Sequence, residues 1–270
     1  MSVHDLIHVF RADPTNVGDW YCPPGRYFPF GSRNACDILS VQSHDLPRRV
    51  ILGGGCLMMP FFESHVRRVF EPTASGHRRI VIGWGVGQGM SADIENGFVA
   101  PYEGPPSPFI DDFDLLGIRD FGTQHCWVPC VSCMHPAFDV AYETVHDIGV
   151  FEHKRIPINI DYFPKSSNDG NDIESAVRFL ASCRIIITNS YHGAYWATLL
   201  GKEVLAFPFN SKFYGLKHPP AFCEPQKWES NLDRVRAFPT ALSECRAANI
   251  NFYKQVSYLL NQEADPESYV

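Results

Sequence analysis

The segment CRIIITNSYHGAYWATLLGKEVLAFPF, residues 183–209, decides the fold because it contains a strand, a helix and a second strand in succession. The apolar run CRIIIT predicts a buried strand, and EVLAFPF predicts another. Between them, Ser190 is an N-cap residue for a helix that begins near Tyr191 and runs through residue 200. A strand, a crossover helix and a further strand are typical of a parallel sheet.

The same alternation of short apolar runs and helix-length segments occurs along the rest of the chain. The sequence therefore predicts an α/β protein with two packed parallel-sheet units, the second one small, and a cleft between them. We expect a first unit at residues 1–144, a second at 145–236, and C-terminal helices at 237–270 that pack back across both. Further strands are predicted at 5–10, 48–55, 78–85, 114–120, 145–153 and 156–161, and helices at 60–70, 172–183 and 238–262.

Composition limits the classes of partner. The chain has 270 residues, 45% of them hydrophobic, which is enough for a real core. A formal net charge of -7 without a lysine or arginine block predicts no nucleic-acid partner. No apolar run approaches the roughly 18 residues of a membrane span, so we expect a cytoplasmic protein that is not integral to the membrane. Peripheral attachment to the inner face of the membrane stays open, as does a homo-oligomer.

Polar residues and glycines gather where the predicted strands end, which is where open parallel sheets bind ligands. Asn16, Gly18 and Asp19 follow the first strand, although Asn16 and Asp19 could instead cap a turn. Gly54 and Gly55 lie in the run ILGGGCL after the second strand, and Gln88 lies in IGWGVGQG after the third. These glycines either let backbone amides approach a ligand or serve packing.

Two later strand ends carry cations. Arg119 follows the run DLLGI and suits capture of a carboxylate or phosphate, unless it forms a structural ion pair with Asp120. His192 lies in the first turn of the helix after Ser190, where free amides attract anions, unless it is a core histidine. Lys212, after the next strand, could add a cation to the same place.

The segment HCWVPCVSCMHP, residues 125–136, allows a rival interpretation. Cys126, Cys130 and Cys133 have the spacing that holds a [4Fe-4S] cluster in radical S-adenosylmethionine enzymes. Zinc held by these thiols with His125 or His135 is a second alternative, and thiols packed in a cleft wall are a third. Because the motif lies in the middle of the chain, we expect no metal ion. An odd count of nine cysteines favours free thiols in a reduced compartment.

Taken together, the motifs TNVGD, ILGGGCL, IGWGVGQG, GIRD, HPAFD and the run from ITNSYHG to FNSKFYG resemble the polysaccharide pyruvyl transferase family. The resemblance covers residues 7–216. It implies two Rossmann-like halves in a glycosyltransferase-B-like arrangement, the N-terminal half on the acceptor side and the C-terminal half on the donor side. The implied reaction transfers the pyruvyl group of phosphoenolpyruvate, without a cofactor, onto a sugar of a polysaccharide or its lipid-linked precursor as a ketal.

The resemblance also assigns roles to residues. It implies that Asp19 acts in acid–base chemistry or acceptor positioning, and that Arg119 and His192 bind the donor. Many family members have Arg-Leu-His where this chain has Ser190-Tyr191-His192, so one donor-binding cation is missing from that place. The implied substrate-binding residues are Asn16, Gly18, Gly54, Gly55, Gln88, Ser190, Tyr191, Gly193 and Lys212.

Two other functions remain as alternatives. A nucleotide-sugar glycosyltransferase of the same fold would need a nucleotide pocket in the second unit, which Glu224 and the aromatic run FPFNSKFYG could supply. A non-catalytic member that binds a glycan or a partner enzyme is the other alternative, supported by the missing arginine.

Overall fold

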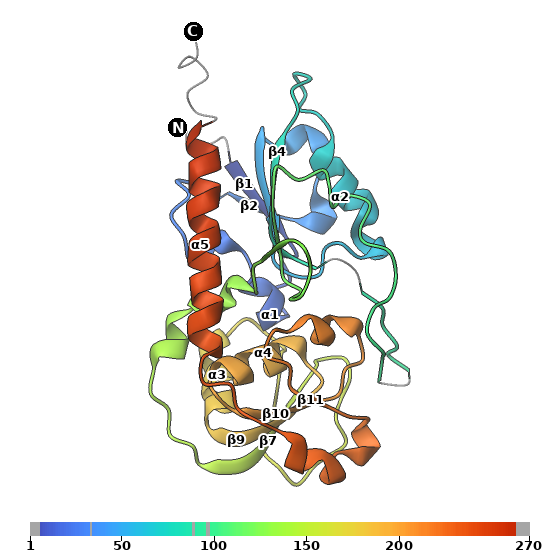
Figure 1. Ribbon diagram of the computed structural model, residues 1–270, viewed down its shortest axis with the longest axis vertical. Coiled ribbons are helices and arrows are strands. Elements are labelled where there is room, and N and C mark those ends of the chain that lie inside the picture. Colours follow the sequence, from blue (N-terminus) through green and yellow to red (C-terminus); the bar gives the residue numbers. More distant parts are fainter. Residues whose placement is uncertain (1–5, 33, 88–89, 96–97, 263–270) are drawn as a thin grey trace.

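The computed structural model describes residues 6–32, 34–87, 90–95 and 98–262, which form two parallel sheets. One sheet occupies the upper half of the molecule and the other the lower half (Figure 1). The prediction of an α/β fold with two parallel-sheet units is confirmed, with six strands in the first sheet and five in the second. The strand order in the first sheet is β2 (Ala35–Asp37), β1 (Leu6–Phe10), β3 (Arg49–Gly53), β4 (Ile80–Val86), β5 (Leu115–Ile118) and β6 (Cys126–Trp127). The order in the second sheet is β11 (Ala221–Phe222), β10 (Glu203–Ala206), β9 (Cys183–Thr188), β7 (His146–Glu152) and β8 (Lys165–Ser167).

Two helices of the second unit begin at residues whose side chains cap them. Ser190 accepts a hydrogen bond from the Gly193 amide, so the predicted N-cap is confirmed, and Asp172 caps its helix in the same way by accepting from the Ser175 amide. The predicted helix at 60–70 starts as a 3-10 turn over Pro60–Phe62 and continues as an α-helix. The α-helices are α1 (Val17–Trp20), α2 (Glu63–Phe70), α3 (Ile173–Ala181), α4 (Tyr191–Leu199) and α5 (Ala241–Gln262).

The strand predicted at 156–161 is wrong. Pro157 has no amide to donate to a ladder, and the segment instead sends Ile158 and Ile160 into the core of the second unit. The neighbour of β7 on that side is β8. The strands β2, β6, β8 and β11, which the sequence did not predict, have two or three residues each, too few to produce a periodic pattern.

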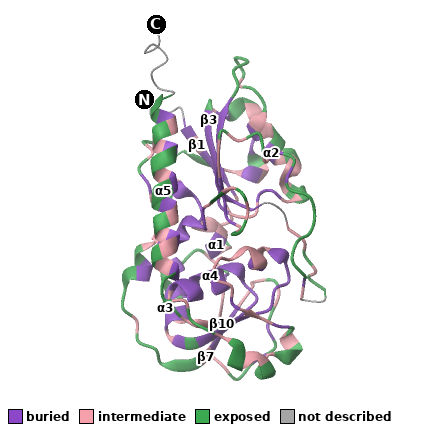
Figure 2. Ribbon diagram, viewed as in Figure 1, coloured by how far each residue is buried: buried purple, intermediate pink, exposed green. Residues whose placement is uncertain are grey.

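The long helix α5 lies along both units (Figure 1). Its outward side is exposed and its inward side is buried (Figure 2). Phe252 packs with Trp84 of the first unit, whereas Cys245 packs in the core of the second. Asn249 accepts a hydrogen bond from Trp84 Nε1 at 2.9 Å and donates one to the Pro129 carbonyl at 3.2 Å. Among the described residues, no helix combines the length and the apolar character that crossing a bilayer requires.

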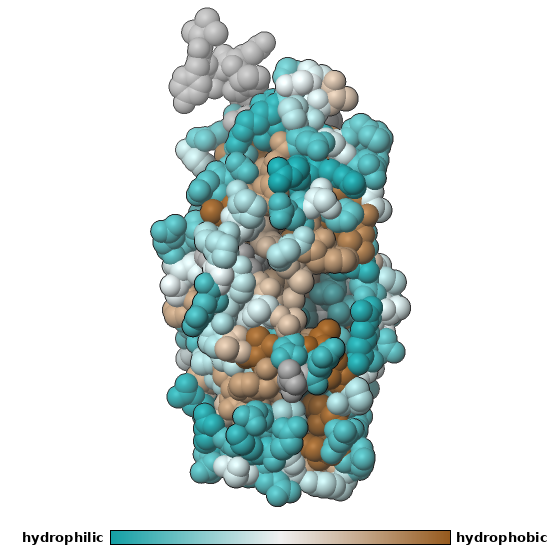
Figure 3. Space-filling view, turned by 90° about the vertical axis from the view of Figure 1, so that its right-hand side faces the viewer, coloured by the Kyte–Doolittle hydropathy of each residue, from teal (hydrophilic) through white to brown (hydrophobic). Residues whose placement is uncertain are grey.

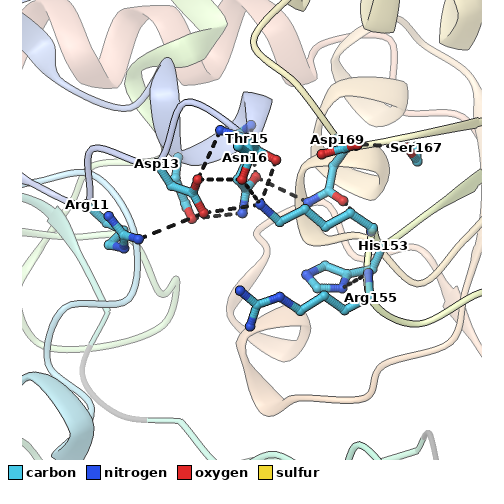
Figure 4. A network of polar contacts seen from close by, with 12 residues as sticks. Arg11, Asp13, Thr15, Asn16, His153, Arg155, Ser167 and Asp169 are labelled. Atoms are coloured by element: carbon cyan, nitrogen blue, oxygen red, sulfur yellow. Dashed lines mark hydrogen bonds and ion pairs between the residues drawn. The ribbon is translucent and has the colours of Figure 1, made fainter.

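A polar network joins the two units beside α1 (Figure 4). Lys154 of the second unit donates to the Asp13 carboxylate at 3.2 Å and to Thr15 Oγ1 at 2.6 Å. Asn168 donates to the side-chain oxygen of Asn16 at 3.2 Å, and its carbonyl accepts from the Val17 amide. These bonds fix α1, which follows the first strand, against the end of the second sheet where α4 begins.

Candidate active site

Two cations that the sequence predicted at strand ends lie beside the first turn of α4. The ring of Tyr191 is contacted by Arg119, whose guanidinium carbon is 4.5 Å from the ring centre, and by Lys212, whose Nζ is 5.3 Å from it. Such contacts are attractive because an aromatic face carries partial negative charge. Arg119 comes from the end of β5 and Lys212 from the segment after β10, so a cation from each unit meets on one side chain.

Arg119 is buried without a full set of partners. Its side chain is 4% exposed, and among the described residues its Nε and Nη2 atoms have no hydrogen-bond partner. Its Nε atom is 3.9 Å from Asp120 Oδ1, too long for a direct hydrogen bond. Because an unsatisfied buried charge is costly, an arginine in this state is suited to receive an anion.

Asp19 lies on α1, half-buried, with its Oδ2 atom accepting a hydrogen bond from Asn16 Nδ2 at 2.8 Å. Burial raises the pKa of Asp19, while the charges of His192 and Lys212 oppose that rise. Burial likewise lowers the pKa of Lys212, and Asp19 opposes it. Asn16 itself caps α1 and accepts from the Gly18 amide, which is the capping role that the sequence left open.

Three of the predicted glycines allow close approach between segments of the site. A Cβ atom added to Gly18 would lie 1.9 Å from His192 Nδ1, so α1 rests directly on the imidazole. Gly54 has a φ of +86° and would place a Cβ 2.3 Å from that of Cys22. Gly55 has a φ of +89° and lies beside Asp19 Oδ1. The turn after β3 therefore meets α1 at the site.

The other predicted residues differ in what they can offer a ligand. The Gly193 amide is used by the Ser190 cap, and a Cβ at Gly193 would meet Phe151 at 2.5 Å. Gln88 lies outside the described residues.

His192 points to a place that the sequence did not predict. Its Nε2 atom is 3.6 Å from Cys22 Sγ and 3.5 Å from Cys130 Sγ, while its Nδ1 atom faces Gly18. Hydrogen bonding to Cys22 holds the pKa of Cys130 well below its usual range, with His192 and Ser132 adding to the effect. Cys22 occurs in WYCPPG, which matches no ligand motif, so only the fold reveals this group.

The predicted cysteine motif does not form a single site. Cys126 is exposed on β6, whereas Cys130 and Cys133 are buried. Cys133 Sγ accepts a hydrogen bond from Asn249, and His135 Nδ1 accepts one from the Ala137 amide. Of the three cysteines, Cys130 alone belongs to the group around His192.

Each of the two units has a cavity beside its strands. One of about 560 Å³ lies in the first unit beside the ends of β1 and β2, and Trp20, Arg26, His8 and Asp37 are among its lining residues. The other, of about 470 Å³, lies in the second unit and is lined in part by Asn189, Phe207, Phe209, Gln226 and Trp228.

No protein-family model and no curated protein matches this chain. Among solved structures, it is similar to E. coli ADP-heptose lps heptosyltransferase II, with a TM-score of 0.35 and 12% sequence identity, over 89% of this chain and 99% of that chain.

Proposed function

We propose that the chain is a pyruvyl transferase that moves the pyruvyl group of phosphoenolpyruvate onto a sugar of a polysaccharide or its lipid-linked precursor. The observation that carries the proposal is the meeting of Arg119 and Lys212 on Tyr191, with two guanidinium nitrogens of Arg119 lacking hydrogen-bond partners among the described residues. Phosphoenolpyruvate carries a carboxylate and a phosphate. Two cations at the start of a helix suit such a double anion.

Asp19 supplies the acid–base group that this reaction needs. The methylene carbon of phosphoenolpyruvate gains a proton and becomes a methyl group, while a first sugar hydroxyl adds to C2 and loses its proton. The C2–O bond to phosphate then breaks, phosphate leaves with the electron pair, and a second hydroxyl adds to C2. The proton of that second hydroxyl departs with the phosphate. A carboxyl group whose pKa burial raises can give the first proton and then accept the hydroxyl proton.

The cavity in the first unit suits the acceptor. Trp20, directly after Asp19, lines it, and the Arg26 guanidinium lies 4.9 Å from the Trp20 ring centre. Aromatic faces and charged side chains are the groups on which a sugar ring stacks and to which its hydroxyls bond. His8 also lines this cavity, and both of its ring nitrogens lack hydrogen-bond partners among the described residues.

In this proposal His192 is a positioning residue. Both of its ring nitrogens face the protein, and its Nδ1 atom lies against Gly18 of α1. It therefore supports α1 and the acid–base group from behind, while Arg119 and Lys212 contact the donor.

The cavity in the second unit favours a nucleotide-sugar glycosyltransferase as the second candidate. It combines the flat Trp228 side chain with the amide group of Gln226, which suit stacking and edge recognition of a base. A band of hydrophobic surface runs over the lower half of the molecule (Figure 3).

Ligand-dependent thermal unfolding distinguishes the candidates. We expect phosphoenolpyruvate to stabilise the protein by about 2.7 kcal/mol at 100 times its dissociation constant. Lys212→Met should abolish that shift, and Lys227→Met, at an exposed lysine paired with Glu224, should retain it. Stabilisation by UDP- or GDP-sugars alone would favour the glycosyltransferase, and no response to any of them would favour a glycan-binding role.

A further inference from the structure

Three soft ligand groups converge where the two units meet α4. Cys22 Sγ and Cys130 Sγ are 3.5 Å apart, and His192 Nε2 is 3.6 Å from the first and 3.5 Å from the second. The three residues are 1%, 5% and 6% exposed and lie far apart in the sequence. They come from the segment after α1, from the segment after β6, and from α4.

We propose that Cys22, Cys130 and His192 bind a zinc ion. In a tetrahedral zinc site with Zn–S near 2.3 Å and Zn–N near 2.0 Å, two sulfurs lie about 3.8 Å apart and a sulfur and a nitrogen about 3.5 Å apart. All three observed separations are within about 0.3 Å of these values. Two thiolates balance the charge of the ion, and the mixed thiolate and imidazole set suits zinc better than a hard cation.

The surroundings hold the ligands in this arrangement. Gly18 lies against the Nδ1 side of the His192 ring, and the Trp196 ring packs on it with centres 5.1 Å apart. Ser132 Oγ is 3.1 Å from Cys130 Sγ and accepts a hydrogen bond from Trp196 Nε1 at 2.9 Å. Fixed neighbours of this kind set the orientation of metal ligands.

Zinc at this position would join the first unit to α4 of the second. Its ligand His192 follows Tyr191 directly in the first turn of α4. The inference does not rest on the proposed function, because none of the three ligand atoms belongs to Arg119, Lys212 or Asp19. With three protein ligands, the fourth tetrahedral position remains for water or for a ligand.

The first test is the zinc content of the full chain, purified after growth with zinc and dialysed against metal-free buffer. We expect about one zinc ion per chain. Cys22→Ser and Cys130→Ser should each lose it, and Cys126→Ser and Cys133→Ala should keep it as exposed and buried controls from the neighbouring motif. A variant that fails to fold would be recognised by its circular dichroism.

A second measurement uses the wild-type protein alone. Exchange of zinc for cobalt(II) should give thiolate-to-cobalt charge-transfer absorption and the intense visible bands of a tetrahedral site. Wild-type protein free of zinc after zinc-supplied growth would overturn the proposal, as would a Cys22–Cys130 disulfide in its place, zinc retained in both ligand variants, or zinc lost in Cys126→Ser. Neither measurement uses phosphoenolpyruvate, so its outcome is separate from that of the proposed reaction.

Discussion

Two buried arginines, one before β4 and the other after the neighbouring strand β5, differ in how many of their N–H donors have hydrogen-bond partners. Arg79, 1% exposed, precedes β4 and donates to the carbonyl oxygens of Ser43, Leu46, Pro47 and Glu71 and to the Ser43 hydroxyl. Arg119, 4% exposed, follows β5 and has two nitrogens without hydrogen-bond partners among the described residues. A buried charge whose donors are satisfied holds the fold, whereas one whose donors are unsatisfied is available to a ligand.

Loss of Arg79 should have the largest effect on stability. Arg79→Met leaves four carbonyl oxygens, buried or partly buried, without the donor that they share, so we expect the free energy of unfolding to fall by about 3 kcal/mol or more. Ligand-induced shifts should persist in protein that folds. Urea unfolding measures the loss, and Arg67→Met, at an exposed arginine paired with Glu63, should change stability by about 0.5 kcal/mol or less. An equal loss in the two variants would contradict the comparison.

His8 extends the comparison to a second buried group, whose ring nitrogens have no hydrogen-bond partner within the described ranges. Burial lowers the pKa of His8 from 6.5 to about 4, so the folded state prefers the neutral ring. The unfolded state therefore binds a proton at His8 at a higher pH than the folded state does. The free energy of unfolding is unaffected by this group above pH 6.5 and decreases as the pH falls toward 4, by about 3 kcal/mol in total.

His8→Leu should therefore lose less stability than the wild type between pH 7 and pH 4.5. His153, whose pKa burial also lowers to about 4, remains in both proteins, so the difference between their unfolding curves isolates His8. Parallel curves would show that the His8 ring is not the group that resists protonation.

Arg119 should behave in the opposite way to Arg79. Arg119→Met removes a guanidinium of which two nitrogens lack hydrogen-bond partners among the described residues, so we expect the free energy of unfolding to change by about 1 kcal/mol or less. Affinity for phosphoenolpyruvate should fall about 10- to 100-fold, since a hydrogen bond to a charged group contributes about 1.5–3 kcal/mol. Calorimetric titration measures the affinity. Strong destabilisation with unchanged affinity would make Arg119 a structural arginine like Arg79.

The sequence predicts which residues lie at this site better than it predicts how they are oriented. Position follows from parallel strands ending at one edge, and Arg119 and Lys212, which were both expected at strand ends, lie beside Tyr191. Orientation depends on side-chain packing between segments far apart in the chain. The approach of Cys22 to His192, separated by 170 residues, leaves no local pattern, and the contact of Gly18 with His192 needs both units in place.

The smallest expected effect comes from the two helix caps. Ser190→Ala and Asp172→Ala each remove the side-chain acceptor of an N-cap and should each lower stability by about 1 kcal/mol. Only the cap at Ser190 lies next to Tyr191, where the two cations meet, so only that variant should also weaken phosphoenolpyruvate binding. Parallel unfolding and titration experiments on the two variants compare them directly. If both variants bind with wild-type affinity, the start of α4 supports the fold alone, and the donor is held by Arg119 and Lys212 without help from the helix.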